Sequence, residues 1–221
     1  MIISDETGTI DAAKLSLITA KTGGTVTLQN AQTISGTGTE VTAALITDAV
    51  TPASGSSATV TGNVTAQVAG NIANVTDITA AFSGTITDTL ANLASGGSIT
   101  TNFSRARGDD TDVKVVVSDG TGTLSAADLK AVTAKTTGTV TLQNAQTVSG
   151  SGSDLVAALK TDPVTLSAAS TATITSAVTA AVAAEIAAIT DITLDSSGDG
   201  TITDTLAVSY THLRAHETKS Y

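Results

Sequence analysis

The chain has 221 residues, enough for one ordinary domain or two small ones, and 41% of them are hydrophobic. Only 2% are aromatic and none is Trp or Cys, which excludes an aromatic-rich core, disulfide bonds and thiol chemistry. The formal net charge of −10 argues against nucleic-acid binding, because the phosphates of a nucleic acid attract Lys and Arg.

Two long copies of one pattern fill most of the sequence. Residues 4–49 align with residues 118–163 at an offset of about 114, and TVTLQNAQT recurs unchanged from Thr25 and from Thr139. GTITDTL recurs from Gly84 and, with a slip of two residues, from Gly200. We therefore expect copy 1 over residues 1–94, a linker over 95–112 and copy 2 over 113–207.

A shorter period of roughly 24 to 28 residues runs inside each copy. Each unit contains a short alternating strand such as 25–28, a polar turn such as 29–32, and a triplet of Thr, an aliphatic residue and Ser, Thr or Asp. The triplets begin at Thr9, Thr33, Thr59, Thr85, Thr123, Thr147, Thr173 and Thr201. The last residue of a triplet is a suitable helix N-cap, because its side-chain oxygen can accept a backbone N–H.

Apolar residues at helical spacing predict a helix after most triplets. They are Leu15 with Ile18 and Leu129 with Val132, Val41 with Leu45 and Leu155 with Leu159, and the two sets Val64, Val68, Ile72, Val75 and Val178, Val182, Ile186, Ile189. The last of these helices lies in the most apolar stretch, 177–189. That stretch is too short to cross a membrane and carries Glu185, so we expect no membrane insertion.

Residues 95–112 break the pattern and are rich in Gly and Asp, so we expect an exposed link between the copies. The chain has two phenylalanines, and Phe103 in this link is predicted to be more exposed than Phe82. Within the link, 107–109 is the Arg-Gly-Asp tripeptide that integrins recognise. Three nearby aspartates, Asp109, Asp110 and Asp112, could bind calcium, and a solvated charged linker is the favoured interpretation.

A second group of candidate calcium ligands lies near the end of copy 2. Asp195, Ser197 and Asp199 are followed by Gly200, which matches positions one, three, five and six of an EF-hand loop. Position twelve would be Leu206, where such a loop needs a bidentate Glu, and copy 1 has no equivalent aspartates. A polar turn is the alternative interpretation. No other cofactor is expected.

The last residues, 208–221, match nothing upstream and contain both His and both Tyr of the chain. The run VSYTHLRAHET resembles one reading frame of a transposon-based sequencing-library adapter. We therefore expect a non-native tail, and we exclude His212 and His216 as metal ligands or catalytic bases. Without the tail the chain has no His or Cys, so we expect no enzymatic activity.

The units predict an α/β repeat fold, in which strand–turn–strand–helix units of about 25 residues stack as a right-handed solenoid. Two all-β, immunoglobulin-like modules, one per copy, are the alternative, and partial disorder is a third possibility. Segment 125–150, SAADLKAVTAKTTGTVTLQNAQTVSG, resembles the Thr/Ala/Val/Gly-rich tandem repeats of giant bacterial, cyanobacterial-type cell-surface and adhesin proteins. The resemblance covers most of residues 1–207.

That resemblance implies an extracellular structural segment, a stalk or spacer, whose partners are neighbouring repeats of the same chain. The alternative function is an adhesin-type module that contacts glycans or other cells and is stabilised by calcium. A spacer would have an unremarkable surface along the array, whereas a binding module would have an apolar or charged patch repeated in both copies.

Overall fold

The computed structural model describes residues 1–48, 50–161, 164–195 and 200–204. The strands of the first half are β1 (Ile2–Ile3), β2 (Thr9–Asp11), β3 (Thr27–Leu28), β4 (Thr33–Thr37), β5 (Ser56–Thr61), β6 (Ile78–Phe82), β7 (Thr85–Asp88), β8 (Ala94–Ser95) and β9 (Ser98–Ile99). Those of the second half are β10 (Lys114–Val117), β11 (Thr123–Ser125), β12 (Val140–Leu142), β13 (Thr147–Gly150), β14 (Val164–Thr165), β15 (Ser170–Ile174) and β16 (Ile192–Asp195).

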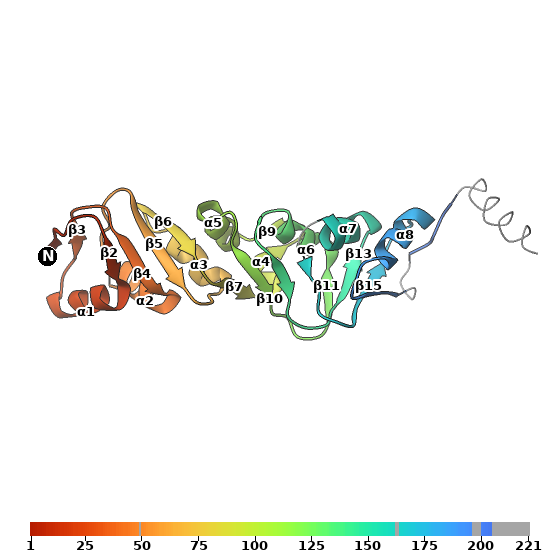
Figure 1. The fold of residues 1–221 in the computed structure, drawn as a ribbon, viewed down its shortest axis with the longest axis horizontal. Helices are drawn as coiled ribbons and strands as arrows, with labels where there is room; N and C mark the ends of the chain where they lie inside the picture. The colour runs from red at the N-terminus through yellow and green to blue at the C-terminus, as the bar shows by residue number, and fades with distance from the viewer. Residues whose placement is uncertain (49, 162–163, 196–199, 205–221) are drawn as a thin grey trace, which may run out of the picture.

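The α-helices are α1 (Ala12–Thr22), α2 (Gly38–Thr42), α3 (Ala66–Ala73), α4 (Leu90–Leu93), α5 (Thr101–Asp109), α6 (Ala126–Thr133), α7 (Gly152–Val156) and α8 (Ala180–Ala187). Two π-helical turns, η1 (Ala43–Thr47) and η2 (Ala157–Thr161), continue α2 and α7. These elements follow one another along an elongated molecule in the order of the sequence (Figure 1).

Parallel strand pairing dominates the fold. Three sheets have the orders β2-β4-β5-β6, β7-β10-β12-β14 and β11-β13-β15-β16, and β1 pairs with β3. Every one of these pairings is parallel, whereas β8 and β9 form an antiparallel hairpin. The fold is therefore mixed α/β, and none of the sheets described closes into a barrel. Two all-β modules are ruled out, because parallel neighbours need crossover connections and these include helices.

Equivalent residues of successive units lie opposite each other in the sheets. Thr33 pairs with Ser57 and Thr147 with Thr171, and each pair is separated by 24 residues. Their hydroxyl groups are hydrogen-bonded at 3.0 and 2.8 Å. The neighbouring Ile34 is fully buried, because successive side chains of a strand point to opposite faces. The predicted alternation of Thr with aliphatic residues is confirmed here.

The predicted helices are present, although most begin later than the triplets suggest. Asp11 and Ser125, each the last residue of a triplet, are the N-caps of α1 and α6 as predicted. In other units the helix begins after a Thr or Ser further along the chain. These N-caps are Thr37, Thr65, Thr89, Ser151 and Thr179. A chain this rich in Thr and Ser offers several suitable caps, so the triplet alone does not select one.

The helices form a row, and small aliphatic side chains fill the core beside them. In copy 1, α1 packs on α2 and α2 on α3, and in copy 2, α6 packs on α7 and α7 on α8. The largest fully buried side chains are Phe103, Leu15, Leu28, Ile34, Ile72, Ile86, Leu93, Leu129, Leu142, Leu155, Ile186 and Val26. None of the described helices is long and apolar enough to span a bilayer.

The segment expected to be an exposed link, 95–112, folds instead as part of the β8–β9 hairpin and as α5. Helix α5 packs against α3. The two helices approach so closely at Gly70 that a Cβ there would lie 2.5 Å from the Cα of Asn102. Phe103 is fully buried whereas Phe82 is 7% exposed, so the prediction that Phe103 is the more exposed is wrong. Only Phe103 and Ala106 of α5 are buried, too few to give an apolar stripe in the sequence.

One sheet runs across the boundary between the two copies. Strand β7, which ends copy 1, pairs in parallel with β10, which begins copy 2, and Val115 lies opposite Ile86. Val64 forms an isolated parallel bridge to Ile86 on the other side of β7. One ladder therefore contains residues from both copies.

Candidate functional site

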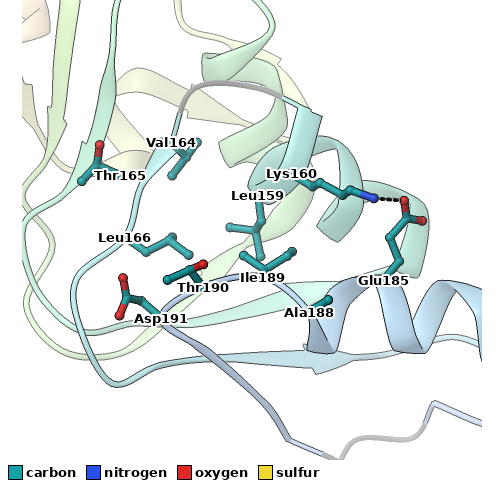
Figure 2. A pocket seen from close by; sticks show the side chains of 10 residues that line it. All are labelled: Leu159, Lys160, Val164, Thr165, Leu166, Glu185, Ala188, Ile189, Thr190 and Asp191. Carbon is teal, nitrogen blue, oxygen red and sulfur yellow. Dashed lines mark hydrogen bonds and ion pairs between the residues drawn. The ribbon is translucent and has the colours of Figure 1, made fainter.

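The hollow drawn in Figure 2 has a volume of about 510 Å³ and lies between η2, β14 and the end of α8. Its walls are largely aliphatic and are formed by Leu159, Val164, Leu166 and Ile189. An ion pair between Lys160 and Glu185 lies at one rim, and Asp191 lies on the opposite side. Because Asp191 lies across the hollow from the ion pair, the titratable side chains that line this hollow do not converge on one point.

The polar rim of this hollow is not repeated in copy 1. By the offset between the copies, Ile46 stands where copy 2 has Lys160, and Asn71 stands where it has Glu185. Neither side chain can form the ion pair. The hollow with its charges is therefore a local feature of copy 2, whereas a binding site of a repeat would be present in each copy.

The calcium ligands predicted near the end of copy 2 are only partly within the described residues. Asp195 is the last residue of β16, opposite Thr173 of β15. Ser197 and Asp199 lie outside the described residues, as does the tail at 208–221 with His212 and His216. Over the described ranges, no group of three or more His, Cys, Asp and Glu side chains is arranged to hold a metal ion.

Two of the three aspartates considered as calcium ligands between the copies contact the backbone of copy 1. Asp109 Oδ2 accepts a hydrogen bond from Ala80 N at 2.8 Å, and Asp110 Oδ2 accepts one from Phe82 N at 2.7 Å. Both donors belong to β6, the edge strand of its sheet. An edge strand leaves backbone N–H groups open to pairing with other strands. The two carboxylates therefore cap this edge and tie α5 to it.

Burial raises the pKa of the Asp110 carboxyl, and nearby Asp112 adds to the increase, while the hydrogen bond from Phe82 N–H acts in the opposite direction. The Asp109 carboxylate belongs to the Arg-Gly-Asp tripeptide, which lies in α5 and not in an exposed loop. The tripeptide was predicted to lie in an exposed link; it lies in a helix, with Gly108 exposed and Arg107 and Asp109 half-buried. Its aspartate is already bound to β6, so the tripeptide does not have the extended, accessible form expected of an integrin ligand.

Copy 2 has ion pairs that join one unit to the next. Lys130 Nζ of α6 lies 3.0 Å from Asp154 Oδ1 of α7, and Lys160 of η2 pairs with Glu185 of α8. Ser151 Oγ also donates a hydrogen bond to Asp154 Oδ2 at 2.7 Å. The Ser151 hydroxyl and the Lys130 ammonium hold the pKa of Asp154 below its ordinary value. These pairs connect successive helices of the row.

Two pairs of amide side chains in the polar turns have a structural role. Gln32 and Gln146 are buried. The side-chain amide of Gln32 donates to two backbone carbonyls of the loop after β1, and that of Gln146 donates to two backbone carbonyls of the loop after β10. Asn30 and Asn144 each donate to the first of these carbonyls. We call each Asn and Gln pair an amide clamp. The unchanged TVTLQNAQT sequence contains both pairs and is the signal that could have identified them.

No family model, no curated protein and no solved structure matches this chain.

Proposed function

We propose that the units stack as a solenoid and that the chain is a structural repeat segment, a stalk or spacer, of a large extracellular surface protein. The observation that carries this proposal is the parallel pairing of β7 with β10. Two independent domains on a flexible link would have separate sheets, and their relative positions would vary. A ladder shared by both copies gives each unit a neighbour to pack on, as solenoid units require.

The distribution of exposed hydrophobic side chains favours a spacer over an adhesin module. Among the described residues, the large hydrophobic side chains that are exposed are Met1, Ile2, Leu17, Ile46 and Ile202. None has an exposed large hydrophobic counterpart in the other copy. A binding surface that used each repeat would show the same patch twice. The net charge of −10 also fits a solvated segment that repels other molecules of the same protein.

The extracellular location rests on the resemblance of 125–150 to repeats of bacterial surface proteins. The absence of enzymatic activity rests on the composition, because no His lies upstream of the tail and no Cys occurs in the chain. A spacer needs only length and stiffness, and the shared ladder provides both.

Stiffness across the boundary between the copies can be measured with two spin labels. The chain has no Cys, so Lys21→Cys and Lys135→Cys introduce the only two labelling sites, at equivalent exposed positions of the two copies. We expect a narrow distance distribution between the labels, as narrow as that of a control pair placed within copy 2. A broad distribution, as a flexible linker gives, would overturn the spacer proposal.

The adhesin alternative is tested separately by applying the unlabelled chain to an array of surface glycans. We expect no binding above that of a control protein of similar charge. Saturable binding that depends on calcium would favour the adhesin function instead.

A further inference from the structure

The first end of the molecule exposes hydrophobic side chains at positions that are covered inside the array. Ile2 of β1 is 67% exposed and Leu17 of α1 is 64% exposed. Their counterparts in copy 2, Val116 and Ala131, are both half-buried. Met1 shows the same contrast, because its counterpart Val115 is 1% exposed. Copy 2 is covered at these positions because the end of copy 1 lies against it.

Three contacts cover the beginning of copy 2. Strand β7 pairs with the edge of β10 that faces away from β12. Asp119 Oδ2 accepts a hydrogen bond from Leu90 N, the first residue of α4, at 2.7 Å. The β8–β9 hairpin packs against α6 and leaves a hollow of about 530 Å³, lined in part by Ile99 and Ala131. The covering elements therefore all belong to the segment 84–101.

The beginning of copy 1 carries the same receiving elements. Strand β1 pairs with β3 as β10 pairs with β12, and its other edge is open. Asp5 is the counterpart of Asp119, and its carbonyl oxygen accepts hydrogen bonds from the amide clamp at 2.8 and 3.2 Å. The corresponding distances at Asp119 are 2.7 and 3.0 Å. The clamp thus holds both loops in the same conformation, with the Asp5 carboxylate exposed.

Two substitutions distinguish this end from the beginning of copy 2. Leu17 replaces Ala131, and a larger aliphatic side chain at this position would fill the hollow that Ala131 leaves beside the hairpin. Lys14 replaces Asp128, whose Oδ1 accepts a hydrogen bond from Gly97 N at 2.6 Å. The first change adds apolar contact and the second removes one hydrogen bond at the exposed tip of the hairpin.

We infer that the face formed by β1, the loop with Asp5 and the exposed side of α1 is a docking surface for the end of another repeat. The occupant is a segment of the type of 84–101, at the end of a further copy of this repeat. Its strand pairs with β1, its short helix is capped by Asp5, and its hairpin packs on Leu17. This inference rests on the proposed stacking of units and specifies how a further repeat is added.

The test is an extended chain in which residues 1–114 are placed directly ahead of Met1, so that Met1 takes the place of Val115. Hydrogen exchange is followed by mass spectrometry in the extended and the original chain. The two identical 2–6 peptides of the extended chain should give two isotope envelopes, one that exchanges as in the original chain and one that exchanges about tenfold or more slowly, because the amides of the original copy 1 gain β-ladder partners. The slower exchange should approach the rate of the peptide 116–120.

Asp5→Ala in the receiving repeat serves as the second measurement. It should leave the melting temperature of the original chain unchanged, and it should lower that of the extended chain about as much as Asp119→Ala lowers that of the original chain. The control is Glu6→Ala, which removes a neighbouring exposed carboxylate and should have no effect in either chain.

Equal exchange of peptide 2–6 in both chains would overturn the inference, as would an equal effect of Asp5→Ala in both. Failure of the added repeat to fold would also overturn it, because the same sequence folds when copy 2 follows it. A narrow spin-label distribution in the original chain combined with any of these results would leave the spacer proposal standing and remove only the docking surface.

Discussion

At the scale of single residues, the amide clamps show how a polar side chain can determine the position of a loop. Gln146 is only 3% exposed, and its Nε2 donates to Asp119 O at 3.0 Å and to Gly120 O at 2.7 Å. Both bonds are part-buried, and a carbonyl that is partly removed from water without a donor costs free energy. The clamp supplies these donors and thereby fixes Asp119, whose carboxylate caps α4.

Gln146→Leu tests this role, because Leu has a similar size but no amide group. We expect a loss of about 0.5–1.5 kcal/mol in the free energy of unfolding, because Gly120 O loses its donor and Asp119 O keeps only the one from Asn144. Urea denaturation followed by circular dichroism measures it. Gln143→Leu, at an exposed position three residues earlier, is the matched control and should change the free energy by less than about 0.5 kcal/mol. Equal effects of the two substitutions would contradict the clamp.

Gly70→Ala tests the close approach of α5 to α3. Ala in the interior of a helix is ordinarily more stable than Gly by roughly 0.5–1 kcal/mol. At Gly70 the added Cβ would lie 2.5 Å from Asn102 Cα and 2.7 Å from Asn102 O, so α5 must shift. We expect a net destabilisation of about 1–3 kcal/mol in urea denaturation.

The control for Gly70→Ala is Asn71→Ala, at the next and exposed position of α3. It should stabilise the protein by a few tenths of a kcal/mol, because Ala has the higher helix propensity. If Gly70→Ala is also stabilising, α5 does not pack on α3 as described.

At the scale of elements, the sequence predicts the strands and helices whose buried residues recur at a regular spacing. The alternating Thr of β4 and β13 predicts these two strands, and the apolar spacing of α3 and α8 predicts these two helices. Each of these elements buries one regular face. Helix α5 was missed because it buries only Phe103 and Ala106 and is held largely through polar groups such as Asp109 and Asp110. Such contacts depend on which segments meet in space, and the sequence alone does not give this.

The link between α6 and α7 predicts a pH dependence. Hydrogen bonding to Ser151 and the charge of Lys130 lower the pKa of Asp154 in the folded chain, so its ionised form stabilises the fold. This contribution is fully present above the ordinary Asp pKa and is lost as the pH falls through the lower folded-state value. We expect Asp154→Asn to be less stable than the original chain at pH 7, and the difference to disappear at low pH.

Urea denaturation of both proteins at a series of pH values measures this difference. Glu6→Gln, which removes an exposed carboxylate, reports the general effect of losing one negative charge. A difference between Asp154→Asn and the original chain that grows as the pH falls would show that the sign is wrong.

At the scale of the whole molecule, four aspartates form contacts within the fold, and two of them, Asp109 and Asp110, are among those that suggested calcium binding. Asp109 and Asp110 cap β6, Asp119 caps α4, and Asp154 pairs with Lys130. A sequence shows that carboxylates are close together along the chain. It does not show whether they already accept hydrogen bonds from backbone N–H groups of another segment. The sequence therefore predicts which residue types gather at the candidate calcium site, but not what their side chains do.

Calcium removal tests this conclusion on the full chain. We expect the same melting temperature in excess calcium and in EDTA, measured by far-ultraviolet circular dichroism. The spectrum should contain both helix and strand in both buffers. A midpoint that falls in EDTA would make calcium a structural ligand, and Asp195 and Asp199 would be the first residues to replace. Magnesium in place of calcium is the control for general ionic effects.

The ladder that crosses the boundary between the copies also has a genetic consequence. Because the beginning of copy 1 carries the same receiving elements as the beginning of copy 2, adding or deleting one whole copy would create no junction of a new type. Unequal recombination between tandem copies would therefore change the length of such a protein in steps of one repeat, and each product would fold by contacts already tested in its parent. A deletion of half a copy would join surfaces that do not match.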